Sequence, residues 1–543
     1  MTSAHDVEAV RAAEQAAAAG LPGGLATLVE RASAALAGVV GSELRAAAGR
    51  VYGSRAVLLV GSGTNGGDAL HAGALLARRG ASVTALLAAD SSHEPRAHGP
   101  GLAALRAAGG RVVEDGAGEA GLAAVAAADV VVDGLLGVGG RPGLRGAAAA
   151  LAGAAARSSA RVVAVDVPSG VDVTTGALPP APTSASASAP ASGSGSAPGD
   201  GSASGAATGG EGSGTAAAVR ADVTVTFGTA KPALLLPPAS ALAGRVVVVP
   251  IGLGDLGDPV VERLGARELA DLWPRPDGES DKYSRGVLGV VAGGATFTGA
   301  AVLSTGAAVR AGAGMVRYLG PTPPTDLVRA RWPEVVPGPG RVQAWLLGPG
   351  VDPDDEGQGE HVREALAQDV PCVVDAGALP ALVTALDEGE RGSGGTLVVP
   401  HAGELARLLG LLGHDCTRAD VQERPLEHAR RAADASGVVV LLKGSTTLVV
   451  DPEGEGGGPR PPVRAQADGT PWLATAGSGD VLAGVVGALA ALGLAPRDAG
   501  AVGAAVHGLA AHAASGGGPL HAEAVLHALP EVLTALLVDV PRG

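Results

Sequence analysis

The sequence predicts an α/β protein of two domains, each built on a mainly parallel sheet with helices on its faces. At 543 residues the chain is too long for one hydrophobic core. Short aliphatic segments of strand length alternate with helical patterns, and Gly-rich turns join several of them. Apolar residues make up 46% of the chain but aromatic residues only 2%, so Ala, Val, Leu and Gly must build both cores.

The first domain is expected over residues 1–254. Residues 7–49 have helical patterns, interrupted by Leu21-Pro22-Gly23-Gly24. A strand at 56–60, a Gly-rich turn, a helix ending near Arg79 and a strand at 82–88 then form a βαβ unit of a parallel sheet. Further strands of this sheet are expected at 111–113, 129–133, 161–165, 222–227 and 245–249.

Two segments lack the pattern of a packed domain. Residues 179–218 contain only Ala, Gly, Ser, Thr, Pro, Asp and Glu. Such a composition cannot bury enough apolar surface to offset the entropy of ordering, so this segment is expected to be a disordered insertion within the first domain. Residues 255–280 gather Gly, Pro and charged residues and are expected to be the linker to the second domain.

The second domain is expected over residues 281–543. It begins with a strand at 287–291 and a helix at 297–312, and three helices close the chain, starting at Ser478 and near Pro496 and Leu520. Pro496 suits the first turn of its helix, where a missing N–H group is tolerated. The other strands are expected at 314–318, 344–347, 371–374, 396–399, 438–442 and 446–450.

Charge and composition exclude several functional classes. The net charge of −15 argues against a nucleic-acid or anionic-membrane surface. Cys372 and Cys416 have no metal-ligand spacing and are expected to be buried thiols in a reducing compartment. Charged residues interrupt the first twenty positions, which excludes a signal peptide, and no apolar run has the roughly 20 residues that span a bilayer. We therefore expect a soluble, cytoplasmic protein.

Polar residues follow three strands of the first domain. Gly61-Ser62-Gly63-Thr64-Asn65-Gly66-Gly67-Asp68 follows the first strand, Asp133 ends another, and Asp166-Val167-Pro168-Ser169-Gly170 follows a third. Ligands of open α/β sheets bind at the carboxyl ends of strands, so these residues predict a site. The glycines also match a dinucleotide-binding fingerprint, with Asp90 as the ribose-binding acid, but that string alone is weak and does not require the polar Asn65 and Asp68.

The second domain carries its strongest signal at Ala474–Gly484. Gly477-Ser478-Gly479 exposes backbone N–H groups where an apolar helix begins, and Asp480 lies in its first turn. Such a helix start suits a phosphate or a developing oxyanion, and the carboxylate can accept a proton from a hydroxyl. The simpler alternative is a helix with Ser478 as its N-cap. Strand ends add Asp375, His401 with Glu404, and the Lys443–Thr447 segment, whose cation and hydroxyls suit a nucleotide phosphate.

These motifs resemble a known family of nicotinamide-nucleotide repair proteins. Asn65–Asp68, Asp133 with its Gly-rich loop, and Asp166–Gly170 resemble the NAD(P)H-hydrate epimerase domain. Residues 281–543 resemble the ADP-dependent NAD(P)H-hydrate dehydratase, a ribokinase-like fold. The implied fold class is a Rossmann-like three-layer α/β/α domain followed by a ribokinase-like α/β domain.

For the first domain the resemblance implies binding of hydrated NADH or NADPH and of a potassium ion. Potassium would lie on Asn65, Asp133 and Ser169, whose oxygens suit a hard cation. Asp68 and Asp166 are both candidates for moving the proton. Thr64 stands where the family has Asn, and Ala69 where it has Gly. The implied substrate contacts are Thr64, Asn65, Gly66, Gly67, Asp68, Gly137, Val138, Gly139, Gly140, Arg141, Pro142, Gly143 and Asp166.

For the second domain the resemblance implies the S hydrate and ADP as substrates, with Mg²⁺. Asp480 is the expected catalytic base. The implied hydrate contacts are Ala300, Gly350, His401 and Asp480. The implied ADP contacts are Lys443, Gly444, Ser445, Thr446, Thr447 and Gly479. Asp281 departs from the family, which has His there.

The expected function is thus repair of NAD(P)H hydrates: epimerisation of the R and S forms, then ADP-dependent dehydration of the S form. The alternative is a ribokinase-like, ATP-dependent kinase of a small molecule fused to a non-catalytic nucleotide-binding domain. A homo-oligomer is expected because ribokinase-like and epimerase domains often self-associate. No nucleic-acid or membrane partner is expected.

Overall fold

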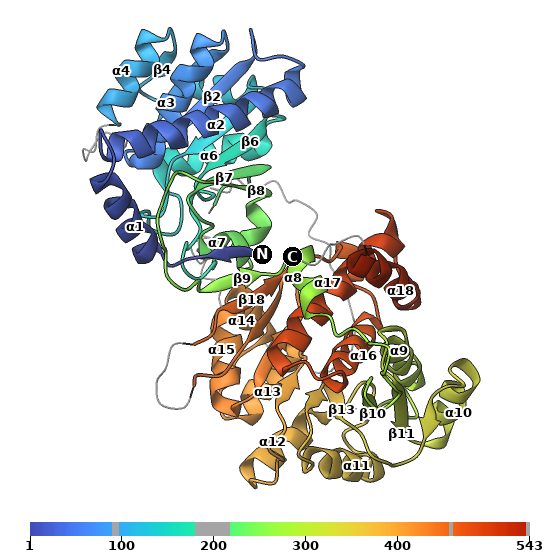
Figure 1. The fold of residues 1–543 in the computed structure, drawn as a ribbon. Helices are drawn as coiled ribbons and strands as arrows, with labels where there is room; N and C mark the ends of the chain where they lie inside the picture. The colour runs from blue at the N-terminus through green and yellow to red at the C-terminus, as the bar shows by residue number, and fades with distance from the viewer. Residues whose placement is uncertain (89–96, 180–217, 455–459, 539–543) are drawn as a thin grey trace, which may run out of the picture.

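The computed structural model describes residues 1–88, 97–179, 218–454 and 460–538. The expected insertion, apart from its end residues, and Asp90 lie outside these ranges. The chain folds into two lobes, each with its own sheet, and the N-terminus lies where the lobes meet (Figure 1). The prediction of a mixed α/β fold with parallel sheets and helices on both sides is confirmed.

The sheet of the first lobe has seven parallel strands in the order β4-β3-β2-β5-β6-β7-β8. Every strand that the sequence predicts in this lobe is present within one residue. Runs of Val and Leu build the central strands because both faces of the sheet are buried. The strands are β2 (Arg55–Val60), β3 (Ser82–Leu87), β4 (Arg111–Val113), β5 (Val130–Gly134), β6 (Arg161–Val165), β7 (Val223–Phe227) and β8 (Arg245–Val249).

Helices cover both faces of this sheet. Buried side chains of α2, α3 and α4 pack on one face and those of α5 and α6 on the other. Helix α2 is long and apolar enough to cross a membrane by length and composition, although Glu30, Arg31, Glu43 and Arg45 interrupt its apolar run. Its Leu28, Leu36, Val40 and Leu44 are buried in the core of the lobe, so packing accounts for its hydrophobicity. The helices are α1 (Val7–Ala19), α2 (Leu25–Ala48), α3 (Thr64–Arg78), α4 (Gly99–Ala107), α5 (Glu119–Ala126), α6 (Gly146–Arg157), α7 (Pro232–Leu235) and the 3-10 turn η1 (Ala239–Leu242).

The second lobe has an eleven-stranded sheet in the order β1-β9-β18-β17-β16-β15-β14-β13-β10-β11-β12. Its centre is parallel, whereas β17 runs antiparallel to both of its neighbours. Strands β1, β9, β12 and β18 were not predicted. The strands are β1 (Thr2–Ala4), β9 (Val261–Arg263), β10 (Val287–Val291), β11 (Met315–Leu319), β12 (Val336–Pro337), β13 (Ala344–Leu347), β14 (Cys372–Val374), β15 (Thr396–Val398), β16 (Val439–Leu442), β17 (Thr447–Val450) and β18 (Val463–Gln466).

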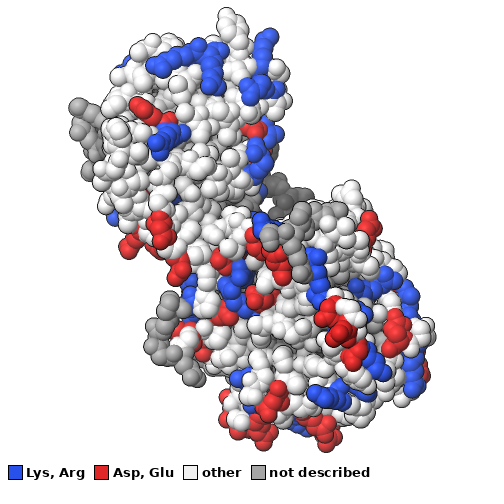
Figure 2. Space-filling model, viewed as in Figure 1, with Lys and Arg blue, Asp and Glu red and all other residues white. Residues whose placement is uncertain are grey.

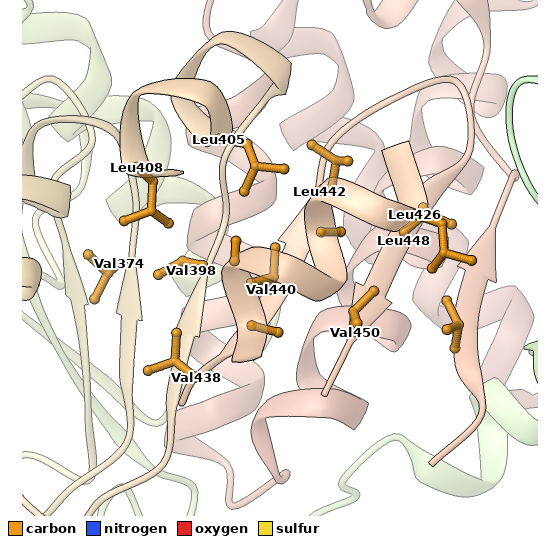
Figure 3. Close-up of a cluster of buried hydrophobic side chains, with 14 of the residues drawn as sticks. Val374, Val398, Leu405, Leu408, Leu426, Val438, Val440, Leu442, Leu448 and Val450 are labelled. Carbon is orange, nitrogen blue, oxygen red and sulfur yellow. The ribbon is translucent and has the colours of Figure 1, made fainter. Parts of the chain in front are cut away.

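Two groups of helices enclose this sheet. Helices α8, α9, α16, α17 and α18 bury their apolar side chains on one face, and α11 to α15 pack on the other. Figure 3 shows the second group, where Leu405, Leu408 and Leu426 lie against valines of successive strands. The helices are α8 (Ala266–Leu272), α9 (Thr298–Arg310), α10 (Thr322–Arg331), α11 (Glu356–Leu366), η2 (Ala376–Ala378), α12 (Leu379–Asp387), α13 (Ala402–Leu411), α14 (Arg418–Glu423), α15 (Pro425–Ser436), η3 (Pro471–Leu473), α16 (Ser478–Ala491), α17 (Pro496–Ser515) and α18 (Ala522–Val538).

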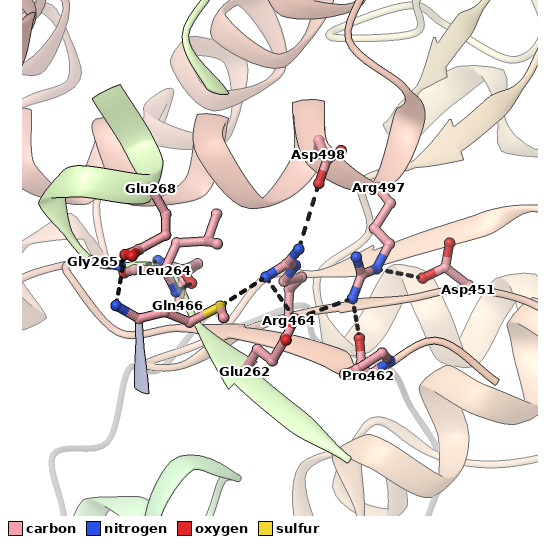
Figure 4. Close-up of polar contacts among 11 residues, drawn as sticks. Glu262, Leu264, Gly265, Glu268, Asp451, Pro462, Arg464, Gln466, Arg497 and Asp498 are labelled. Carbon is pink, nitrogen blue, oxygen red and sulfur yellow. Dashed lines mark hydrogen bonds and ion pairs between the residues drawn. The ribbon is translucent and has the colours of Figure 1, made fainter. Parts of the chain in front are cut away.

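The expected linker, residues 255–280, contains the strand β9 and the helix α8. The N-terminal strand β1 pairs antiparallel with β9, and β9 pairs parallel with β18. The Met1 amino group lies 2.7 Å from Glu268 Oε2, and Arg464 of β18 lies 2.7 Å from Glu262 Oε2 of β9 (Figure 4). The first residues of the chain therefore form the edge of the second lobe's sheet.

The two lobes also share a hydrophobic core. A single cluster of buried residues joins Val167, Val171 and the Ala233–Leu236 segment of the first lobe to strands and helices of the second. On the face shown in Figure 2, acidic and basic side chains are interspersed over the second lobe. The lobes are thus joined by strand pairing and by apolar packing.

Candidate active sites

The first site lies at the carboxyl ends of β2, β5 and β6, which are neighbours in the sheet. Residues Thr64–Asp68 form the first turn of α3, and from Asn65 onward they are buried. The Asn65 side-chain amide donates to the carbonyl oxygens of Val165 at 2.7 Å and Leu136 at 3.3 Å. The structure thus brings together the three strand ends that the sequence singled out.

The glycines of the apparent dinucleotide fingerprint serve backbone packing. A Cβ atom at Gly61 would meet the Leu135 carbonyl, and one at Gly66 would meet the Gly61 carbonyl. Both glycines allow neighbouring backbone segments to approach each other closely. This packing accounts for the two glycines without a bound dinucleotide.

Asp133 and Ser169 form a buried pair beside Asn65. The Ser169 hydroxyl donates to Asp133 Oδ1 at 2.6 Å, and the Ser169 N–H donates to Oδ2 at 2.9 Å. Burial raises the pKa of Asp133 to about 6, although the hydrogen bonds from Ser169 lower it. A buried carboxylate, a hydroxyl and an amide oxygen are a suitable donor set for a hard monovalent cation.

A charged cluster lies next to that pair. Lys231 Nζ is 2.6 Å from Asp166 Oδ1, and the Thr226 hydroxyl donates to the same oxygen at 2.9 Å. Burial, together with the charge of Asp166, raises the pKa of Asp68 to about 7, while the Ser33 hydroxyl acts in the opposite direction. Asp166 has a positive φ of 68°, which is unusual for a residue other than glycine and is typical of functional sites.

The Gly-rich loop, Gly137–Gly143, borders the site and is partly exposed. The Gly143 N–H donates to the Gly170 carbonyl, which ties the loop to the segment after β6. Arg141 is exposed, and Arg11 of α1 donates to the Val138 carbonyl at 3.4 Å. The loop therefore carries one arginine and is contacted by a second, and such cations suit a pyrophosphate.

The second site lies at the start of α16. Gly477 has a φ of 84° and is the N-cap, and the Ser478 hydroxyl donates to the carbonyls of Leu473 and Thr475. The alternative role of Ser478 as the N-cap is therefore wrong. Burial and the charge of Asp375 raise the pKa of Asp480 to about 7, opposed by Lys443. Asp480 has the properties of a general base poised near neutral pH.

Lys443 lies between two acidic groups at this site. Its Nζ lies 3.0 Å from Asp375 Oδ1 and 3.6 Å from Glu404 Oε2. Burial alone would lower the pKa of Lys443, but Asp375 and Glu404 raise it above its usual value. A Cβ atom at Gly479 would lie 3.3 Å from Nζ, so the ammonium group faces the start of α16. This places a cation beside the N–H groups that the first turn of a helix leaves unpaired.

His401 has a structural role that the sequence did not indicate. Its Nδ1 accepts from the N–H groups of Gly403 and Glu404 and so caps α13. This bond assigns the proton of the neutral ring to Nε2, which lies 3.7 Å from Glu404 Oε1. The His401 side chain is 58% exposed, so the ring is accessible to a ligand.

The remaining expected contacts differ in accessibility. Gly444 and Ser445 are exposed, whereas Thr446 is buried and its hydroxyl lies 3.3 Å from that of Ser240 in the first lobe. Thr446 therefore faces the domain interface, which was not expected of a nucleotide contact. Thr447 begins β17. Ala300 and Gly350 are in contact, because a Cβ atom on Gly350 would lie 2.6 Å from that of Ala300.

Several residues of the sites were missed by sequence reasoning. Lys231, Thr226, Ser33 and Glu14 belong to the first site, and none is part of a motif. One signal was available, because Lys231 precedes a run of apolar residues in a chain with only three lysines. Of the expected buried thiols, Cys372 is buried but Cys416 only partly so.

Comparisons with known proteins cover both lobes. A family model described as NAD(P)H-hydrate dehydratase matches residues 288–525, and one described as the YjeF-related protein N-terminus matches residues 25–233. The bifunctional NAD(P)H-hydrate repair enzyme Nnr of Mycobacterium tuberculosis is 41% identical over 502 residues, covering 92% of this chain and 91% of that protein. The enzyme of the same name from Mycobacterium leprae is 40% identical and covers 93% of both chains.

A solved structure also matches about half of the chain. The ADP/ATP-dependent NAD(P)H-hydrate dehydratase from Bacillus subtilis, co-crystallised with ATP and Mg²⁺, is 25% identical with a TM-score of 0.45. It covers 51% of this chain and 99% of its own. Because the similarity to the mycobacterial enzymes extends over more than nine-tenths of both chains, this chain belongs to the family of bifunctional NAD(P)H-hydrate repair enzymes.

Proposed function

We propose that the two lobes of this repair enzyme catalyse successive steps. The first interconverts the R and S epimers of hydrated NADH and NADPH (NADHX and NADPHX). The second dehydrates the S epimer at the expense of ADP and gives NAD(P)H, AMP and phosphate. One observation carries the proposal of two active sites: each lobe has an acid with a pKa of about 7 near a lysine-paired carboxylate at the carboxyl end of an inner strand.

In the first lobe, Thr64–Asp68, Gly137–Gly143 and Asp166 would hold the hydrate. The hydrate epimers differ at a carbon that bears a hydroxyl and adjoins the ring nitrogen, so their exchange requires proton transfer at that hydroxyl. Asp133, Ser169 and the Asn65 oxygen would hold potassium, which supplies positive charge near the substrate. This proposal is supported by the burial of Asp133 and by its lack of an ion-pair partner in the described part of the chain.

In the second lobe, Asp480 accepts the proton of the hydrate hydroxyl, and the resulting oxygen attacks the β-phosphorus of ADP. The bond to the bridging oxygen breaks, and AMP leaves. The N–H groups of Gly477–Gly479 and the ammonium of Lys443 stabilise the charge on the transferring phosphoryl group. The phosphate then leaves the substrate with its bonding electrons, and loss of a ring proton completes the dehydration.

The second site also fits Mg²⁺ that arrives with the nucleotide. In the described ranges no group of three acidic, His or Cys side chains could hold a metal ion by itself. Mg²⁺ is commonly held by substrate phosphates and only one or two protein oxygens. Asp375 and Glu404 are the available carboxylates near Lys443, and the ion would neutralise phosphate charge.

The similarity to repair enzymes favours this function over the alternative of a small-molecule kinase fused to a non-catalytic domain. We further propose a cytoplasmic enzyme whose partners are NADHX, NADPHX and ADP, and which associates with itself.

A mixed R/S preparation of NADHX tests the division of labour. With ADP, complete recovery of NADH is expected, and with ADP omitted, none. Recovery that stops at the S fraction would contradict the epimerase role of the first lobe. Replacing potassium by choline should slow the conversion of the R epimer by about 10- to 100-fold, by analogy with losses at metal sites. The conversion of the S epimer should keep its rate. Use of ATP with phosphorylated hydrate as the end product would instead support the kinase.

A further inference from the structure

The epimerase lobe contains a lysine that is almost completely buried. Lys231 is 2% exposed, and its three ammonium hydrogens have three partners. These are Asp166 Oδ1 at 2.6 Å, the Thr226 hydroxyl at 3.1 Å and the Phe227 carbonyl at 2.9 Å. Burying an ammonium group is unfavourable unless it is paired, so the position of this lysine requires an explanation.

The surroundings indicate that the reason is Asp166. Lys231 immediately precedes α7, and its neighbour Ala230 forms a bridge with Ala4 of β1. The Thr229 hydroxyl is 2.8 Å from His5 Nδ1 and donates to the Ser3 carbonyl. This segment is therefore held in place from the second lobe's sheet edge, and it directs the ammonium group at one oxygen of Asp166.

Three carboxyl groups come together here, but only one contacts the lysine. Asp68 of α3 accepts a long hydrogen bond, 3.4 Å, from Ser33 of α2, and within the described ranges it has no ion-pair partner. Burial and the charge of Asp166 raise the pKa of Glu14 of α1, while the charges of Lys231 and Arg11 lower it. Neighbouring carboxylates cannot all ionise freely, so the unpaired ones must take up protons first.

We propose that Lys231 is a positioning residue of the epimerase, whose ammonium group holds the Asp166 carboxylate in a buried ion pair, so that Asp68 carries the exchangeable proton. This proposal rests on the proposed epimerase function of the first lobe. It separates the roles of two acids that sequence reasoning left equivalent: Asp166 binds and stabilises positive charge on the substrate, and Asp68 transfers the proton. The burial of Asp68 and the charge of Asp166, which raise the pKa of Asp68 to about 7, agree with this assignment.

The step balances without any other reactant. Asp68 gives its proton to the hydroxyl of the hydrate, and the carbon–oxygen bond breaks as the ring nitrogen supplies its electron pair. The cation that forms lies near the Asp166 carboxylate. Water adds to the opposite face of the same carbon and releases a proton to solvent, from which Asp68 is reprotonated, so nothing is oxidised or reduced.

The test uses the full-length enzyme, purified R-NADHX and no ADP, and follows the R and S epimers by chromatography over a range of pH. Wild type should show activity that falls as pH rises through about 7, because Asp68 must be protonated. Lys231→Met should slow epimerisation at least about tenfold and move this midpoint upward by about one pH unit, because the two acids then share protons without a cation. Lys282→Met, the same change at an exposed lysine, is the matched control.

Two further variants keep the proposal testable if Lys231→Met folds poorly. Thr226→Val removes one hydrogen bond to Asp166 and should move the midpoint in the same direction by less. Asp68→Asn should abolish the titration near pH 7 together with epimerisation. Dehydration of S-NADHX with ADP checks that each variant is folded. An unchanged midpoint in a folded Lys231→Met or Thr226→Val, or a retained one in Asp68→Asn, would overturn the proposal. Inactive wild type would instead refute the proposed function.

Discussion

The two sites each contain a lysine–carboxylate pair, but they differ in how deeply the lysine is buried. In each, a lysine pairs with a carboxylate at a strand end, Asp166 in one lobe and Asp375 in the other. In each, a second acid has a pKa near 7. However, the Lys231 side chain is 2% exposed and saturated by protein groups, whereas that of Lys443 is 18% exposed and faces a helix start. The first lysine can only arrange its neighbours, while the second can also meet a ligand.

The largest expected effect concerns the acid of the second site. Asp480→Asn removes the proposed base and should slow dehydration of S-NADHX by about 10²- to 10⁴-fold. Affinity for ADP should change little, because the asparagine keeps the helix start intact. Dehydration followed by NADH absorbance, with ADP binding by calorimetry, checks both expectations. Turnover at the wild-type rate would refute the role of Asp480.

The next effect tests whether the two lysines differ as described. Lys443→Met should abolish ADP binding and leave Asp375 unpaired in the interior, which costs about 3–5 kcal/mol when a buried pair is broken. Epimerisation of R-NADHX should persist below the unfolding temperature. Lys282→Met again serves as the control. If ADP binds Lys443→Met normally, the ammonium group does not face the nucleotide.

A smaller effect concerns the stability of the second lobe. The folded-state pKa of Asp480 lies above its ordinary value of 3.8, so ionising it opposes folding. That penalty is absent below pH 4 and grows as pH rises to about 7. The melting temperature of Asp480→Asn should therefore exceed that of wild type at pH 8, by about 2–4 °C for each kcal/mol relieved. At pH 4 the two proteins should melt at the same temperature. Calorimetric scans at both pH values measure the difference, and a lower melting temperature at pH 8 would contradict it.

The smallest effect lies at the joint between the lobes. Burial raises the pKa of Glu268, but hydrogen bonds from the Met1 amino group and the Gly265 N–H outweigh it and lower the pKa below its ordinary value. The stability from this ionised group is present above pH 4.5 and lost as pH falls through the lower folded-state pKa. Glu268→Gln should lower stability at pH 7 by under about 1 kcal/mol, as for exposed ion pairs. Denaturant melts measure it, and an equal loss at pH 2 would rule out the ionic origin.

The sequence predicted the central strands because long aliphatic runs leave little choice of structure. It also predicted that Asn65, Asp133 and Ser169 would meet, since neighbouring parallel strands end at one edge. It missed β1 and β9, which are three residues each and gain their stability only from partners far away in the chain. It missed Lys231 for the same reason, because an isolated lysine shows its role only when Asp166 is seen beside it.

The potassium and nucleotide contacts remain predictions, and the structure modifies one of them. Thr446 shares a motif with Lys443, yet its hydroxyl meets Ser240 of the other lobe. A linear motif records which residues are near in the chain but not which way each side chain points. His401 makes the same point, because one ring nitrogen caps a helix while the other lies 3.7 Å from Glu404 Oε1.

The pairing of β1 with β9 has a consequence for synthesis on the ribosome. Thr2–Ala4 leaves the exit tunnel early, yet its partner Val261–Arg263 follows some 260 residues later and β18 later still. During elongation the first lobe can complete its own sheet, while β1 has only its bridge to Ala230 and lacks its strand partner β9. The edge strand of the dehydratase lobe is thus formed by the residues that were synthesised first. The sheet of that lobe is completed only after the whole first lobe has been synthesised.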